Sequence, residues 1–327
     1  MDYNRLKEAI NNFEEKNILV IGDVMIDAYI IGKVDRISPE APVPVVTVKN
    51  RYNRLGGAAN VALNIKTLGA NPILCSVIGD DNKGDDFLQL LNDLKMNPQG
   101  IIRSRNRPTT TKFRIIGNNT QMLRVDEESV EKLTAEEQIN LSVKIIDILD
   151  QTPVDAIIIE DYDKGCLDSY IIELIASEAK RRKIPVTADP KKNNFASYQH
   201  ITLFKPNFKE LQEGLNIELS SNNFEQIAQI SQEYLRNKKL KMMLVTLSEN
   251  GMLICNKKEW HHIPAVVRNI ADVSGAGDTV ISTITLALSH GLSMEESAYL
   301  ANIAGGLVCE KVGVVPIGKD ELINELS

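Results

Sequence analysis

The chain of 327 residues is poor in aromatic side chains, at 5%, has only four cysteines and carries no excess of positive charge. Its 44 acidic residues outnumber 37 lysines and arginines, and this net charge of −7 argues against a nucleic-acid-binding protein. The cysteines Cys75, Cys166, Cys255 and Cys309 lie far apart without a CxxC pair, so we expect buried thiols and neither a zinc site nor disulfides. No apolar run approaches the length of a membrane span, and no basic, apolar leader begins the chain. We expect a soluble, cytoplasmic protein that binds neither nucleic acid nor membrane.

Short apolar runs alternate with helical patterns along most of the chain. Apolar residues at Ile139, Val143, Ile146 and Leu149 mark one of the helices. Strands are predicted over 17–22, 73–79, 154–159, 185–188, 241–246 and 252–255, and further helices directly after Gly57 and over 171–179. This alternation is typical of a mostly parallel sheet with helices on both faces.

Two stretches interrupt the alternation. Residues 28–49 and 109–125 contain alternating apolar and polar residues, and Asn118-Asn119 in the second is typical of a turn. Both patterns predict antiparallel hairpins, and we expect the two hairpins to pair into a small sheet over the mouth of the main one. The sequence thus predicts a single α/β domain over 1–327 with a β-lid inserted at two points.

The segment from Ala271 to Thr279, ADVSGAGDT, predicts a glycine turn that opens a buried helix. Gly275 and Gly277 lack Cβ atoms, so backbone N–H groups can approach a phosphate at the positive end of the helix. Asp278 in the first turn can accept the proton of an attacking sugar hydroxyl. The alternative is that Asp278 merely caps the helix.

Polar residues follow other predicted strands at the edge where open α/β sheets bind ligands. Asp27 can bind vicinal hydroxyls, or it can be a solvated loop residue. Gly56 and Gly57 allow a sugar to approach the backbone, or they serve tight packing, while Asn60 can donate to and accept from a hydroxyl. These residues form the candidate sugar site.

Two further groups of polar residues are predicted at this edge of the sheet or on the lid: two residues that can act around magnesium, and a set of cations. Asn207 and Glu210, three residues apart, can order magnesium-bound water, although Asn is also a common helix cap. We expect the substrate to carry a phosphate, because cations cluster beside the predicted sugar pocket; the alternative is a solvated lid face. The proposed phosphate set is Arg107, Lys112, Arg124 and Lys164.

The motifs GDVMIDAY, GGAANVALNIKTLGA, KPNFKEL and DVSGAGDT, in this order, resemble those of the ribokinase-like, phosphofructokinase B type sugar kinases. RISPEAPVPV, QMLRVD and DYDKG are similar to the heptose 7-phosphate kinases within that family. No HxGH nucleotidyltransferase signature is present, so the chain resembles a kinase module alone. Ser274 stands where the family often has Thr, and Glu160 adds a negative charge before DYDKG.

This resemblance implies a ribokinase-like three-layer α/β sandwich with a central, mostly parallel sheet, a small antiparallel β-lid and dimerisation through the lids. It implies ATP and Mg²⁺ as cofactors and leaves a need for a monovalent cation such as K⁺ open. It further implies that Asp278 is the base, that Asp27, Gly56, Gly57 and Asn60 hold the sugar, and that Asn207 and Glu210 act around MgATP. The remaining implied residues are an anion hole of Gly275, Ala276 and Gly277, and a nucleotide site that includes Lys191, Thr246, Gly251 and Asn302.

The resulting prediction is an ATP-dependent kinase that acts on the anomeric hydroxyl of D-glycero-D-manno-heptose 7-phosphate, on the route to ADP-heptose for lipopolysaccharide. The alternatives are a kinase of fructose, ribose, fructose 6-phosphate or 2-keto-3-deoxygluconate, and a non-catalytic sugar-binding regulator on the same fold.

Overall fold

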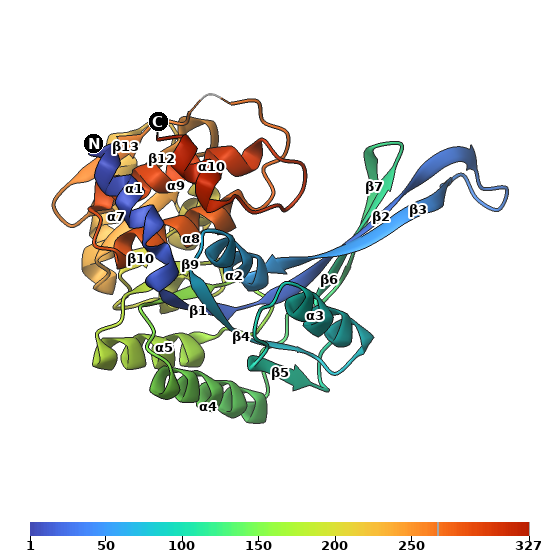
Figure 1. Cartoon of the computed structure of the whole chain (residues 1–327), viewed down its shortest axis with the longest axis horizontal. Coiled ribbons are helices and arrows are strands. Elements are labelled where there is room, and N and C mark those ends of the chain that lie inside the picture. Colours follow the sequence, from blue (N-terminus) through green and yellow to red (C-terminus); the bar gives the residue numbers. More distant parts are fainter. Residues whose placement is uncertain (267, 327) are drawn as a thin grey trace.

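The computed structural model describes residues 1–266 and 268–326. Within these residues, nine strands form one sheet in the order β13-β12-β11-β10-β9-β8-β1-β4-β5 (Figure 1). All neighbours pair in parallel except at β11–β12 and β12–β13. The strands are β1 (Asn17–Gly22), β4 (Asn71–Gly79), β5 (Gly100–Ser104), β8 (Ala156–Glu160), β9 (Val186–Asp189), β10 (Leu203–Phe204), β11 (Met242–Thr246), β12 (Met252–Asn256) and β13 (Trp260–Ile263).

Helices cover both faces of this sheet because its strands are apolar on both faces. In β1, Ile18 and Val20 enter one buried cluster, whereas Leu19 and Ile21 enter the other. The first cluster involves α1 (Tyr3–Asn11), α2 (Ala58–Thr67), α3 (Asn82–Asp93), α8 (Ala276–Ser289), α9 (Met294–Cys309) and α10 (Lys319–Asn324). The second involves α4 (Ala135–Gln151), α5 (Ser169–Arg182), α6 (Phe208–Leu215) and α7 (Phe224–Lys238).

The order of the strands reverses between β1 and β8. On one side of β1 lie β4 and β5, and on the other side lie β8 and the strands that follow it in the chain. Gly22 of β1 lies beside Glu160 of β8, where both strands end. Such a reversal leaves a crevice at the carboxyl ends of the strands, where open α/β sheets bind ligands. Both the lid and the loop after β8 start from this point.

The lid is a separate four-stranded sheet that projects from the body as an arm (Figure 1). Its order is β3-β2-β6-β7, from β2 (Val24–Ile37), β3 (Pro44–Gly57), β6 (Thr111–Gly117) and β7 (Thr120–Glu127). The two hairpins are antiparallel within themselves, and they join through a parallel pairing of β2 with β6. The lid strands run farther into the body than residues 28–49 and 109–125, because β2 begins at Val24 and β3 ends at Gly57.

The predicted ribokinase-like architecture is confirmed, with two local corrections. Ile139 and Val143 of α4 are exposed, and the buried stripe joins the predicted Leu149 to Leu141 and Ile145. Both faces of α4 carry apolar residues, so spacing alone did not identify the buried one. Several short or polar elements were not predicted, namely α1, α3, β5, α7 and α10.

The cysteines and the helices bear on two predictions made from the composition. Cys75, Cys166 and Cys255 are buried thiols, as expected, and Cys309 is half-buried. Among the described residues, the structure contains no helix that combines the length and apolar character needed to cross a bilayer.

Candidate active site

Asp278 lies in the first turn of α8, directly behind the glycine turn. Gly275 is the N-cap residue and adopts φ +82°, a left-handed conformation that favours glycine. The Asp278 side chain is nearly buried, at 5% exposure, and stands at the positive end of the helix. The sequence therefore folds this carboxylate into the crevice rather than onto a solvated surface.

Two side chains from distant parts of the chain donate hydrogen bonds to the Asp278 carboxylate. The Asn60 Nδ2 group of α2 lies 2.6 Å from Oδ2, and the Tyr162 hydroxyl in the loop after β8 lies 2.8 Å from Oδ1. Burial raises the pKa of Asp278 to about 6, against the opposing effect of these two hydrogen bonds. The carboxylate thus contacts donors across the crevice instead of capping its own helix, and Tyr162 is a residue that sequence reasoning missed.

Asn60 keeps one polar atom for a ligand. Its Oδ1 is buried and has no hydrogen-bond partner among the described residues. A Cβ on Gly275 would lie 3.3 Å from the Asn60 Nδ2 atom, so the glycine turn passes close to this amide. Asn60, Gly275 and Asp278, to which the resemblance assigns parts of one site, therefore lie together in the structure.

A buried group of acids and lysines lies under the glycine turn. Asp189 at the end of β9 pairs with Lys205 at 2.7 Å, and a Cβ on Gly277 would lie 3.6 Å from Lys205 Nζ. Glu160, on the neighbouring strand β8, is fully buried, and neither carboxylate oxygen has a partner among the described residues. Burial and the nearby charge of Asp189 raise the pKa of Glu160 well above its usual value, which favours its neutral form.

Asn207 and Glu210 form a capping box at the start of α6. Asn207 Oδ1 accepts from the Glu210 backbone N–H at 2.8 Å, and Glu210 Oε2 accepts from the Asn207 backbone N–H at 2.8 Å. The other Glu210 oxygen pairs with Lys191. The helix-cap interpretation of this pair therefore describes its present contacts, and a role around magnesium stays a prediction.

Three of the predicted nucleotide residues lie around a largely apolar cavity of about 410 Å³ that ends at the glycine turn. Thr246, Gly251 and Asn302 line this cavity together with Ala276 and Gly277. An apolar cavity with few polar groups is the usual form of a site for a planar ligand such as a nucleobase. Lys191 lies outside this cavity, beside Glu210 and Tyr162.

Asp27 lies at the base of the lid and pairs with Arg114 of β6. Burial raises the pKa of Asp27, and the charge of Arg114 opposes this shift. A Cβ on Gly56 would lie 2.7 Å from Asp27 Oδ2, and one on Gly57, at φ +59°, would lie 2.4 Å from the Asp23 carbonyl oxygen. These two glycines thus allow close packing, which is the alternative that the sequence left open.

Arg114 and Arg54 were not predicted as site residues. Arg54 lies over the stacked rings of Tyr29 and Tyr52, and Arg114 also lies over Tyr29. Arg54 donates to the Val314 carbonyl at 3.2 Å, which links the lid to the segment beside the glycine turn. Charged residues recur along both lid strands, so the sequence pattern did not single out Arg54 or Arg114.

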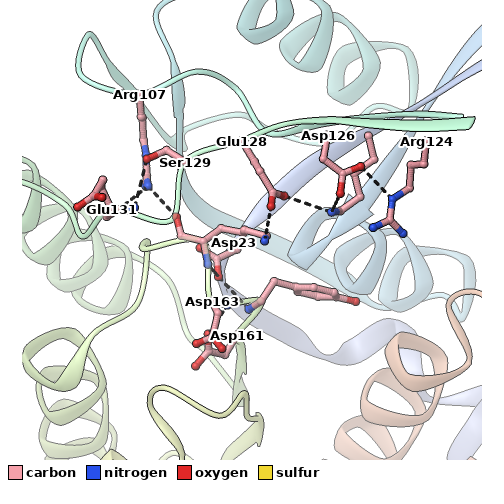
Figure 2. Close-up of polar contacts among 12 residues, drawn as sticks. Asp23, Arg107, Arg124, Asp126, Glu128, Ser129, Glu131, Asp161 and Asp163 are labelled. Carbon is pink, nitrogen blue, oxygen red and sulfur yellow. Dashed lines mark hydrogen bonds and ion pairs between the residues drawn. The ribbon is translucent and has the colours of Figure 1, made fainter.

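Three of the four proposed phosphate-binding cations form one chain of ion pairs with two acids. Arg124 contacts Asp126 at 2.9 Å, Asp126 contacts Lys112 at 3.2 Å, and Glu128 contacts Lys112 at 3.2 Å and Lys164 at 2.7 Å. Figure 2 shows Arg124, Asp126 and Glu128 in a row along the lid. The structure therefore brings these three cations together.

Arg107 is placed differently. Its Nη2 atom donates to the backbone carbonyls of Lys164 at 2.6 Å and of Glu131 at 2.9 Å (Figure 2). These contacts hold the loop after β8 against the segment that leaves the lid. Arg107 therefore binds backbone carbonyls, whereas Lys112, Arg124 and Lys164 pair with acidic side chains.

Asp23 fixes the loop that carries Tyr162 and Lys164. Its carboxylate accepts hydrogen bonds from the backbone N–H groups of Tyr162 at 2.8 Å, Lys164 at 3.1 Å and Cys166 at 3.0 Å. Burial and the charge of Asp161 raise the pKa of Asp23 to about 6, against these three hydrogen bonds. Sequence reasoning missed this residue because its partners are about 140 positions away.

Solved structures with the same architecture are sugar kinases. Phosphofructokinase-2 from Escherichia coli in complex with potassium has a TM-score of 0.79 at 20% identity, and it covers 95% of this chain and 99% of that one. Ribokinase of Arabidopsis thaliana complexed with ribose and ATP has a TM-score of 0.73 at 18% identity, with 95% and 99% coverage. At these identities the likeness establishes the fold.

Relatives found by sequence share more identity with this chain than these solved structures do. The chain is 43% identical over 311 residues to the Bifunctional protein HldE of Methylobacillus flagellatus, and 39% over 308 residues to that of Helicobacter pylori. These alignments cover 95% and 94% of this chain but 63% and 65% of the relatives, so the chain spans just under two thirds of their length. The resemblance drawn from the motifs is confirmed, because residues 15–319 match the pfkB family carbohydrate kinase model. The chain belongs to the pfkB family of carbohydrate kinases.

Proposed function

We propose that the protein transfers the γ-phosphoryl group of ATP to the anomeric hydroxyl of D-glycero-D-manno-heptose 7-phosphate, giving the 1,7-bisphosphate for ADP-heptose and lipopolysaccharide core synthesis. The observation that carries the reaction class is the buried Asp278 carboxylate, held by Asn60 and Tyr162 at the start of α8. The choice of sugar is supported by the heptose-kinase-like motifs and by relatives named HldE at about 40% identity.

Asp278 is placed to act as the base. It takes the proton of the sugar hydroxyl as that oxygen attacks the γ-phosphorus and the bond to the ADP oxygen breaks. Asn60 and Tyr162 orient the carboxylate, and the free Oδ1 of Asn60 can accept a hydrogen bond from a neighbouring sugar hydroxyl. Backbone N–H groups of the glycine turn can stabilise the negative charge on the transferred group.

The nucleotide fits between the apolar cavity and the glycine turn, with Lys205 and Lys191 placed to neutralise its phosphates. Mg²⁺ prefers oxygen ligands and keeps several waters. The buried Oδ1 of Asp189, which accepts no hydrogen bond among the described residues and lies 3.9 Å from Lys191 Nζ, and the Glu210 carboxylate are suitable acceptors for such waters. When bound, the ion supplies charge neutralisation of the phosphates.

The phosphate of the sugar is assigned to Lys112 and Lys164, with Arg124 at the outer end of the same ion-pair chain. Lys112 is on lid strand β6, and Lys164 is on the body loop that also holds Tyr162. A phosphate between them would connect the lid to the loop that contacts Asp278. This arrangement favours a phosphorylated sugar over a neutral one.

A kinase screen tests the substrate. Heptose 7-phosphate should give a higher kcat/KM than unphosphorylated heptose, fructose, ribose, fructose 6-phosphate or 2-keto-3-deoxygluconate. Lys112→Gln and Lys164→Gln should each raise the KM for heptose 7-phosphate about tenfold or more and leave that for ATP unchanged, because each loses a charged hydrogen bond. Lys180→Gln, exposed on α5, is the matched control. Normal KM values in both lysine variants would rule out this pocket.

The lid also supports a proposal of dimerisation. Apolar side chains at its surface lack cover in the single chain, and such patches commonly mark contacts between proteins. These exposed residues are Ile37, Val43, Val48, Met122, Leu123 and Val125. A second copy of the lid is the proposed partner, and sedimentation of Leu123→Gln tests it, since a wild-type mass would contradict the assignment.

A further inference from the structure

Glu128 occupies the space between the two lysines to which the substrate phosphate is assigned. It follows the last residue of β7, and one carboxylate oxygen contacts Lys164 at 2.7 Å while the other contacts Lys112 at 3.2 Å. Figure 2 shows the Glu128 carboxylate between the lid and the body loop above Asp23. A single carboxylate thus bridges two cations that belong to different parts of the fold.

The bridge is partly shielded from water but not sealed. The side chains of Lys112, Lys164 and Glu128 are 15%, 17% and 22% exposed. Partial burial pushes the pKa of Glu128 up, but the hydrogen bond from Lys164 and the charge of Lys112 outweigh it and hold the pKa below its usual value. Glu128 is therefore an anion at neutral pH, bound where another anion can still reach the same lysines.

We propose that Glu128 is a displaceable carboxylate, which occupies the phosphate-binding lysines of the empty enzyme and exchanges for the phosphate group of the sugar. This inference rests on the proposed phosphate site. Two lysines and two acids, Asp126 and Glu128, make the inner part of the ion-pair chain neutral before the sugar arrives. Retaining Glu128 beside a bound phosphate would add like-charge repulsion at hydrogen-bond range, so exchange is favoured over joint occupancy.

The exchange sets a threshold for anion binding at these lysines. A phosphate group carries a charge of about −1.5 to −2 at neutral pH and has three acceptor oxygens, so it can satisfy both lysines better than one carboxylate. A neutral sugar offers no group that can replace Glu128, so the pairs with Lys112 and Lys164 persist. Every anion that replaces Glu128 must first break these two pairs, so a free anion binds weakly, whereas a sugar phosphate adds the contacts of its sugar. Glu128 therefore sets an affinity threshold that keeps small anions from occupying the phosphate site.

The test is the affinity for inorganic phosphate, measured by calorimetry at fixed ionic strength on the full chain. Glu128→Gln keeps the shape of the side chain but removes the competing charge, and it should bind phosphate about tenfold more tightly than the wild type. Glu127→Gln is the matched control, because Glu127 is exposed, adjacent, and makes no ion pair among the described residues. Unchanged or weaker binding by Glu128→Gln would overturn the proposal.

Two further variants separate this inference from the proposed function. If Lys112→Gln and Lys164→Gln weaken phosphate binding while Glu128→Gln does not strengthen it, the phosphate site stands and the exchange is wrong. If neither lysine variant weakens phosphate binding, the site itself is wrong. Thermal unfolding gives a second readout, since phosphate should raise the Tm of Glu128→Gln more than that of the wild type. An equal or smaller rise would contradict the exchange.

Discussion

The buried carboxylates beside the crevice and the carboxylates of the lid ion-pair chain respond to their surroundings in opposite ways. In the body, burial dominates and raises the pKa of Asp278 to about 6 and that of Glu160 well above its usual value. In the lid, hydrogen bonds and cations outweigh partial burial and lower the pKa of Asp126 and Glu128. The body therefore provides a carboxylate that can exchange protons near neutral pH, and the lid provides charges that can exchange partners.

Removing the basicity of the body carboxylate should have the largest effect. Asp278→Asn keeps the shape of the side chain, and kcat should fall about 10²- to 10⁴-fold, the usual contribution of a positioned base. Steady-state kinetics and nucleotide binding measure the two effects separately, and ATP affinity should remain close to that of the wild type. Asp147→Asn, exposed on α4, is the control. Turnover within a few-fold of wild type would remove Asp278 from the mechanism.

Changing one donor to that carboxylate should have an intermediate effect that depends on pH. The base must be ionised, so activity should fall as the pH drops through about 6, the raised pKa of Asp278. Tyr162→Phe removes a hydrogen bond that lowers this pKa, so the acidic limb should move upward by about one pH unit.

The comparison at two pH values sharpens this test. Activity of Tyr162→Phe should be reduced about fivefold near pH 6, and much less near pH 8, where Asp278 is ionised in both the wild type and the variant. Tyr170→Phe, exposed on α5, should keep the wild-type profile. An acidic limb that stays in place or moves downward would show that the Tyr162 hydroxyl does not tune the base.

The smallest expected effect is a change in the mobility of the lid when substrates bind. Residues 28–49 and 109–125 should exchange amide hydrogens faster than α8 in the free protein and gain protection with heptose 7-phosphate and a non-hydrolysable ATP analogue. Mass spectrometry resolves these segments. Equal protection with and without ligands would mean that the lid is already fixed, and protection limited to inner faces would indicate a permanent interface between lids.

The parts of the fold that the sequence predicted are those with a repeated apolar pattern. The strand at 17–22 and the helix after Gly57 were predicted in this way, because burial on both faces of a parallel strand requires a continuous apolar run. The helices α3 and α7 were not predicted, although Phe87 and Leu91 in α3, and Ile227, Tyr234 and Leu235 in α7, form buried stripes among many polar residues. The exposed Ile139 and Val143 show the converse, because apolar residues on an uncovered face imitate a core stripe.

The site was predictable where one local motif contains the chemistry. The glycine turn and Asp278 are contiguous, and Asn60 follows its own glycine pair, so their places at helix starts could be inferred. Tyr162 and Asp23 could not be found in this way, because their roles arise only when loops far apart in sequence meet. Glu128 was missed for the same reason.

The backbone at Asp23 has a mechanical consequence. This one residue separates β1, in the rigid sheet, from β2, in the lid, and its carboxylate holds the N–H group of Tyr162. At the other side of the arm, β3 ends at Gly57, one residue before the helix that carries Asn60. Both ends of the lid are therefore connected to the two donors of the Asp278 carboxylate. A displacement of the arm would reach Asp278 through the backbone at Asp23 and Gly57 and through these hydrogen bonds, so the position of the lid is coupled to the orientation of this carboxylate.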